Sequence, residues 1–227
     1  MRSKILVAIL VLLMLALPAA PAHAGGIVSV CDEAHLLAAL AGGGTVTFAC
    51  SGTITLTSTI SIAVDTTIDG SGQAVTISGN DAVRVFTVNE GVTLNLNSLR
   101  VAHGSIPSGN GGGIYSVGTG NTLTVSNSTF YFNSTSAGYG GGIYSAGTGS
   151  TLTVSNSIFS GNSHNGIYSE GGTLTVSNST FSGNSILGGY AGAIYKNAGA
   201  ATVSNSTFSD NSATWIGGAI LNSTGTM

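Results

Sequence analysis

The sequence predicts an all-β protein in which short parallel strands stack into a β-helix. One strand-like phrase recurs in the second half of the chain, beginning at Thr122, Thr151 and Thr173 and, one residue shorter, at Ala201. A glycine-rich marker that usually ends in Ile-Tyr alternates with this phrase, and apolar and polar residues alternate from Thr45 onward. A single copy cannot bury its own apolar face, so the copies must stack on one another.

The spacing of the marker indicates the size of one coil. Its isoleucines are separated by 29, 24, 27 and 26 residues. They are Ile114, Ile143, Ile167, Ile194 and Ile220. This spacing fits a coil of about three short strands whose turns accept insertions. An antiparallel sandwich would not explain identical residues at coil spacing. We therefore predict β-helix repeats over residues 52–227.

Stacking at about 4.8 Å per layer places identical residues above one another. The inward ladders are expected to be Leu123, Leu152 and Leu174; Val125, Val154, Val176 and Val203; and Phe130, Phe159, Phe181 and Phe208. A buried asparagine ladder is expected at the corner after the strand, with each amide donating to the same side chain one layer away. Its predicted members are Asn127, Asn156, Asn178 and Asn205.

Residues 1–24 have the pattern of a secretory signal. Arg2 and Lys4 precede an apolar run over residues 5–17, and Ala22-His23-Ala24 provides a cleavage site. The run is short for a bilayer-spanning helix, and a retained membrane anchor is the alternative. We expect an exported mature chain without a transmembrane helix.

One helix is predicted after the signal, over residues 32–41 of an N-terminal cap at residues 25–51. Asp32 can cap its start, Leu36, Leu37 and Leu40 are expected on one face, and Gly42-Gly43-Gly44 ends it. Such a helix is suited to covering the apolar end of the stacked strands.

The only two cysteines, Cys31 and Cys50, flank this helix. In an exported protein a disulfide is the favoured interpretation, and it would stabilise this region by about 3 kcal/mol. Two free buried thiols are the alternative, because spacing alone does not show that the side chains meet.

Two short motifs interleave along residues 92–222. FxxN stands at 130–133, 159–162, 181–184 and 208–211, and GGA(I/L/V) is complete at Gly217-Gly218-Ala219-Ile220. In these motifs the chain resembles the polymorphic outer-membrane protein repeat family. The resemblance implies a right-handed β-helix, secreted or exposed on a bacterial outer membrane, with adhesin-like roles and no catalysis established for the family. Because Gly225-Thr226-Met227 stands where another copy would begin, we expect further repeats or an anchor domain beyond it.

The charged residues do not predict an active site. Five Lys and Arg against eight Asp and Glu, without a basic cluster, argue against nucleic acid as a partner. Asp69, Asp81 and Asp210 stand singly in turn-like contexts, whereas glycoside hydrolysis needs facing carboxylates. His103-Gly104 resembles the His-Gly step of polygalacturonases, but a lone surface histidine is the simpler interpretation. No metal site or cofactor is predicted.

Threonines form the most regular surface pattern. Those expected to point outward in register are Thr122, Thr124, Thr151, Thr153, Thr173 and Thr175. Such an array resembles the surface of β-helical ice-binding proteins, although threonine also suits any exposed strand. In the fourth copy we expect Ala200 and Ala201 to replace the first two array positions.

These observations predict a non-enzymatic, secreted or cell-surface protein that acts in adhesion or as a structural spacer. The expected partner is a surface ligand, either a glycan or a protein of a host or neighbouring cell. A carbohydrate-active enzyme is the first alternative, and an ice-binding protein is the second.

Overall fold

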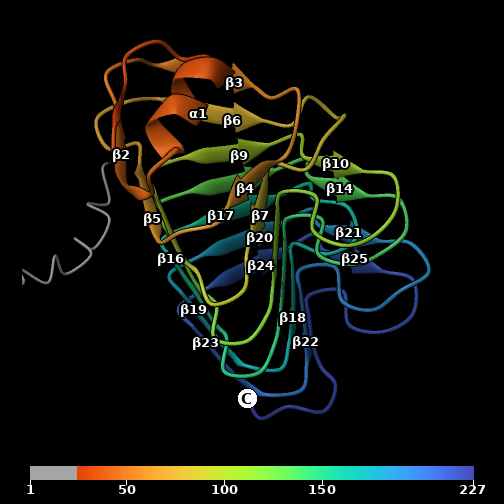
Figure 1. Cartoon of the computed structure of the whole chain (residues 1–227). Coiled ribbons are helices and arrows are strands. Elements are labelled where there is room, and N and C mark those ends of the chain that lie inside the picture. The colour runs from red at the N-terminus through yellow and green to blue at the C-terminus, as the bar shows by residue number, and fades with distance from the viewer. Residues whose placement is uncertain (1–24) are drawn as a thin grey trace, which may run out of the picture.

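The structure is a computed structural model that describes residues 25–227. The predicted signal at residues 1–24 lies outside the described residues. From its capped N-terminal end the chain winds downward in the view of Figure 1, and successive coils add strands to three sheets. The paired strands of these sheets are parallel, so the predicted parallel β-helix is confirmed.

Sheet A has eight strands. In sheet order they are β1 (Ile27–Val28), β2 (Gly44–Phe48), β5 (Thr66–Asp69), β8 (Thr93–Asn97), β12 (Thr122–Ser126), β16 (Thr151–Ser155), β19 (Thr173–Ser177) and β23 (Ala200–Ser204). β2 belongs to this sheet although it lies within the predicted cap, so the stack of strands begins earlier than residue 52.

Sheets B and C have seven strands each. Those of sheet B are β3 (Gly52–Thr55), β6 (Val75–Ser78), β9 (Arg100–Ala102), β13 (Thr129–Tyr131), β17 (Ile158–Ser160), β20 (Thr180–Ser182) and β24 (Thr207–Ser209). Those of sheet C are β4 (Ile60–Ile62), β7 (Phe86–Val88), β11 (Ile114–Val117), β15 (Ile143–Ala146), β18 (Ile167–Glu170), β22 (Ile194–Asn197) and β26 (Ile220–Asn222). Two short pairs lie beside them, β10 (Ser105–Ile106) with β14 (Ser134–Thr135) and β21 (Ser185–Ile186) with β25 (Ser212–Ala213).

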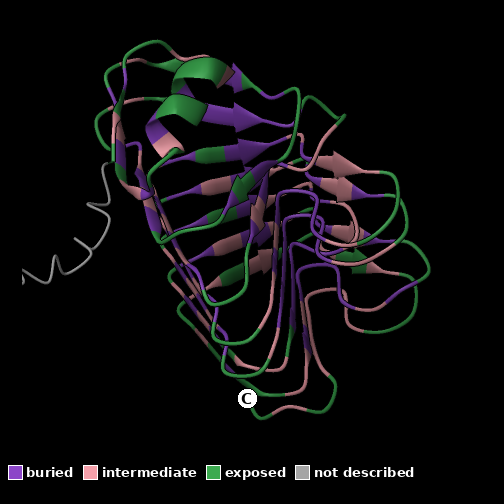
Figure 2. Ribbon diagram, in the orientation of Figure 1, coloured by how far each residue is buried: buried purple, intermediate pink, exposed green. Residues whose placement is uncertain are grey.

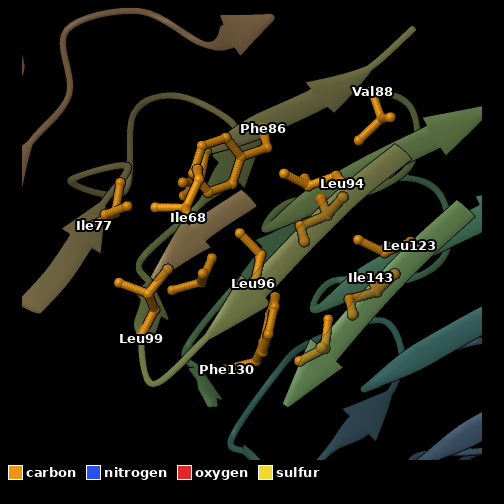
Figure 3. Close-up of a cluster of buried hydrophobic side chains, with 14 of the residues drawn as sticks. Ile68, Ile77, Phe86, Val88, Leu94, Leu96, Leu99, Leu123, Phe130 and Ile143 are labelled. Atoms are coloured by element: carbon orange, nitrogen blue, oxygen red, sulfur yellow. The ribbon is translucent and has the colours of Figure 1, made fainter. Parts of the chain in front are cut away.

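The core contains the predicted apolar ladders. Leu123 pairs with Leu152, and Val125 pairs with Val154, in strict register. The rings of Phe130 and Phe159 stack with centroids 4.9 Å apart, and the stack continues through the two later phenylalanines. Figure 3 shows such side chains filling the space between the sheets, and Figure 2 shows how buried and more exposed residues alternate along the strands.

Helix α1 (Glu33–Leu40) covers the first layer, as predicted. The Asp32 side chain accepts a hydrogen bond from the His35 amide and caps the helix. Leu36 and Ala39 are the buried residues, whereas Leu37 is 43% exposed, so its predicted place on the buried face was wrong. Residues three positions apart share a face of this helix, and Leu37 is rotated away from that line.

The Cys31–Cys50 disulfide is present and confirms the pairing. It joins the segment before α1 to the end of β2, with 5.7 Å between the two Cα atoms. The helix is therefore tied covalently to the layer that it covers.

The predicted asparagine ladder was wrong in its burial. Asn127, Asn156, Asn178 and Asn205 do stand at equivalent corners, but all four are exposed. Each has a positive φ near 50°, a left-handed conformation that asparagine adopts more readily than most residues. These asparagines therefore fit the backbone of the corner rather than an internal hydrogen-bond network.

The buried amide ladder consists instead of the asparagines that end the FxxN motifs. They are Asn133, Asn162, Asn184 and Asn211, of which the first three have no exposed surface. Asn162 Oδ1 accepts from the backbone N of Asn133 (3.1 Å) and from its Nδ2 (3.0 Å). Asn162 Nδ2 donates to Asn184 Oδ1 (2.8 Å) and to the Phe130 carbonyl (3.0 Å). These bonds satisfy buried turn backbone and join successive coils.

Candidate binding surfaces

The outer side of sheet A is the most regular polar surface of the described chain, and we call it the hydroxyl face. The alternation along each strand sends apolar residues inward and leaves three outward rows. The middle row is Thr45, Thr67, Asn95, Thr124, Thr153, Thr175 and Thr202. The first row holds Thr93, Thr122, Thr151 and Thr173, and the third holds Thr47, Asp69, Asn97, Ser126, Ser155, Ser177 and Ser204.

The six threonines of the predicted array therefore lie in register on one face. The expectation for the fourth copy was wrong at one position. Ala201 pairs with the inward Leu174 and is itself buried, whereas Thr202 pairs with Thr175 and continues the middle row. Only Ala200, the partner of Thr173, interrupts the array. The phrase is one residue shorter there, and counting from its first residue shifted the alternation.

Polar contacts differ between the two ends of this face. In the early coils, Asn95 Nδ2 donates to Thr67 Oγ1 (3.2 Å), and Asn97 Nδ2 donates to Asp69 Oδ1 (2.9 Å). The hydroxyls of Thr124 and Thr153 in the later coils make no hydrogen bond to other residues of the described chain. These hydroxyls are available to water or to a ligand.

The carboxylates are dispersed, and most hold turns. Asp69 Oδ1 accepts from the Ser71 amide (2.9 Å), and hydrogen bonds from Ser71 lower the pKa of Asp69. Asp81 and Asp210 both have a positive φ near 55°, which is the turn geometry expected for them. Across residues 25–227, no three His, Cys, Asp or Glu side chains converge in a group that could hold a metal ion.

His103 has close neighbours and is not the lone surface residue that we predicted. Its Nδ1 lies 3.2 Å from Asp81 Oδ1, and its ring packs against Tyr131 and Phe132. His35, by contrast, belongs to the start of α1, with Nδ1 2.8 Å from Asp32 Oδ1.

His164 differs in setting from His103. His164 is partly buried in a corner with a positive φ of 66°, and burial lowers its pKa. The loops around His164 are rich in glycine. Together with Tyr139 and Leu187, the His164 side chain lines an open groove of about 280 Å³.

Lys196 is a feature that sequence analysis missed. Lys196 lies two residues after the inward-facing Ile194 on β22, so its side chain also points into the interior of the solenoid. It has no exposed surface there. Its Nζ donates to Ser169 Oγ (3.0 Å) and to the carbonyls of Gly171 and Gly172. These partners are neutral, and burial lowers the lysine pKa from 10.5 to about 8. The available signal was Ile-Tyr-Lys in place of the Ile-Tyr-Ser of earlier coils.

Among the comparisons with known proteins, the match to a family model agrees with this architecture. No curated protein matches the chain in sequence. Among solved structures, the crystal structure of Jun a 1, the major allergen from cedar pollen, is similar at 15% identity, with a TM-score of 0.42, over 86% of this chain and 72% of that one. No helix within residues 25–227 has the length and apolar character needed to cross a membrane. The model of the family described as right handed beta helix region matches residues 112–225, and the chain therefore belongs to the right-handed β-helix family.

Proposed function

We propose that this chain is a non-enzymatic, secreted or cell-surface protein of the polymorphic outer-membrane repeat kind, which adheres to an extended surface through the hydroxyl face. The observation that carries the proposal is the middle row, which aligns threonine or asparagine across seven successive strands of sheet A. The FxxN motifs that carry the family resemblance also build the buried amide ladder, which supports the closer assignment.

The physical basis is repeated weak contact from a rigid surface. β-Branched threonine has a restricted χ1 angle, so little conformational entropy is lost when its hydroxyl binds. Each hydroxyl both donates and accepts, and layers about 4.8 Å apart repeat the same group. Once one contact to a polymer or a cell surface has formed, the next hydroxyls meet their partners at a high effective concentration. Many weak contacts therefore give a strong overall affinity.

Adsorption to insoluble polysaccharides tests this role. The purified chain would be incubated with cellulose, chitin and peptidoglycan, and the bound fraction would be measured. Thr153→Tyr places a bulky ring at the centre of the hydroxyl face, and Thr180→Tyr makes the same change on the outer side of sheet B. We expect adsorption by the parent, at least about tenfold weaker binding of Thr153→Tyr, and parent-like binding of Thr180→Tyr.

Either of two results would contradict adhesion through this face. One is a parent protein that binds none of the three polysaccharides, and the other is equal loss in both tyrosine variants. Release of soluble sugar from the same substrates that ceases in Asp81→Asn would instead support the carbohydrate-active alternative.

Ice binding is a second candidate, favoured by the regular register of the threonine rows. Continuation of the middle row to Thr202, and the unbonded hydroxyls of Thr124 and Thr153, both extend the surface available for ordered water. Thermal hysteresis in the parent that disappears in Thr153→Tyr would support this function. Ice growth that starts immediately below the melting temperature in the presence of the parent would eliminate it.

A further inference from the structure

The corner that follows the sheet B strands carries glycine in some coils and a bulky side chain in others. From β9 to β24, the residue that follows each sheet B strand has a left-handed backbone at this corner. Gly161 and Gly183 occupy the position in two later coils, with φ of 63° and 62°. His103 and Phe132 occupy it in two earlier coils, with φ of 50° and 52°. A bulky side chain is disfavoured in this conformation, so Phe132 is an outlier that needs an explanation.

Phe132 belongs to a compact surface cluster, which we call the aromatic corner and which also contains Asp81, His103 and Tyr131. The His103 ring centroid lies 5.5 Å from that of Tyr131 and 5.7 Å from that of Phe132. The ring centroids of Tyr131 and Phe132 are 5.7 Å apart, and the two rings are nearly perpendicular. Asp81 Oδ1 lies 3.2 Å from His103 Nδ1, and the Asp81 side chain is 70% exposed.

The glycine of the next coil makes room for the Phe132 ring. A Cβ atom at Gly161 would lie 2.6 Å from Cε1 of Phe132 and 2.8 Å from Cδ1, closer than atoms can pack. The ring therefore lies against the Gly161 backbone on one side and against His103 and Tyr131 on others. Phe132 nevertheless remains 56% exposed. A fixed ring thus presents apolar surface to solvent at a cost in backbone strain.

We propose that the aromatic corner binds a pyranose unit of a glycan. A pyranose has an apolar C–H face, which would stack on the exposed Phe132 ring, and a rim of hydroxyls. The Asp81 carboxylate would accept hydrogen bonds from that rim, and His103 would donate or accept according to its tautomer. This combination of an apolar platform and a few polar groups is the usual composition of a small-ligand site.

The aromatic corner lies at the end of the sheet B strands, whereas the hydroxyl face lies on sheet A. Its proposed ligand does not depend on the function of that face. A basic peptide is the principal competing ligand, because an aromatic ring beside a carboxylate can also attract a cation. We favour the sugar because the three rings stand at 42° to 82° to one another and only Phe132 is exposed, so they present one stacking ring rather than a cage that encloses a cation.

An array of immobilised glycans with glucose, galactose, mannose and N-acetylglucosamine termini, printed beside an immobilised oligolysine peptide, tests the proposal. Phe132→Gly introduces the residue found at this position in the next two coils, so the variant is expected to fold. Ile158→Thr is the matched control. It removes a 45%-exposed apolar side chain from the outer side of sheet B, where Thr129 and Thr180 are its register partners.

We expect the parent and Ile158→Thr to bind the same glycans and Phe132→Gly to lose at least about tenfold in affinity. Asp81→Asn keeps a residue type tolerated in a left-handed turn and should weaken binding to the same glycans. Thr153→Tyr should have no effect, which separates this site from the hydroxyl face. The proposal is overturned if the parent binds no glycan, if it binds only basic peptides, or if Phe132→Gly binds as the parent does.

Discussion

Replacing Asn162 by leucine tests whether the buried amide ladder stabilises the solenoid. Leucine has a similar shape but removes four hydrogen bonds made by the Asn162 side chain. The backbone N–H of Asn133, which donates to Asn162 Oδ1, loses that acceptor in the interior. One orphaned buried group costs about 1 to 3 kcal/mol, and each further lost bond costs about 1 kcal/mol. We expect the free energy of unfolding to fall by about 4 to 6 kcal/mol.

Asn156→Gly is the matched control, because it alters the exposed asparagine six positions earlier in the same coil. Glycine tolerates the φ of 50° found there, so stability should change by about 0.5 kcal/mol or less. Urea denaturation followed by circular dichroism gives both values under identical conditions. A loss below about 1 kcal/mol in Asn162→Leu, or equal losses in the two variants, would refute the assignment of the ladder.

Three further predictions concern the cap, the interior and the aromatic corner. Reducing the Cys31–Cys50 disulfide, which spans a sequence separation of 19, should lower the free energy of unfolding by about 3 kcal/mol, and an unchanged urea midpoint under reducing conditions would contradict this. Because the folded-state pKa of Lys196 is about 8 against 10.5, the unfolded chain binds more protons between these values, and stability should rise with pH in this window. After allowance for solvent screening we expect a gain of about 1 to 2 kcal/mol between pH 7 and pH 9.5, which Lys196→Met should abolish, and a pH-independent difference between the two proteins would oppose the prediction. Phe132→Gly should raise the free energy of unfolding by up to about 1 kcal/mol through relief of strain, whereas a clear decrease would show that the ring stabilises the fold.

Periodicity was sufficient to predict the architecture. The recurring Leu, Val and Phe positions predicted the inward ladders, because a parallel stack is the arrangement that places identical residues above one another. The helix and the disulfide followed from local signals, namely a capping aspartate, a glycine stop and a single pair of cysteines. Both are short-range features that depend little on distant parts of the chain.

Periodicity did not distinguish between the two asparagines of each coil. Asn156 and Asn162 recur equally regularly, and either corner could have accommodated a buried amide. The structure separates them by backbone geometry: Asn156 occupies a left-handed exposed corner, whereas Asn162 points between layers. Burial at a corner depends on the direction of the turn, which the repeat spacing does not encode.

Individual departures from the repeat were the least predictable features. Phe132 stands where the next two copies have glycine, and Lys196 stands where earlier copies have serine. When the repeat copies are compared in the sequence alone, both residues look like ordinary variation between copies. The role of Phe132 depends on its left-handed φ, and the role of Lys196 depends on the inward direction of its side chain. Both features became visible only in the three-dimensional structure.

The uniform register of the coils also has a consequence for how such a chain can change in length. Each coil offers nearly the same Leu, Val and Phe residues to the layer above and to the layer below. Loss of residues 151–172 would join Ser150 to Thr173 and bring two already complementary layers together. A gene for this protein can therefore gain or lose whole coils by recombination without creating a new interface. The reach of the molecule can then evolve independently of its local structure.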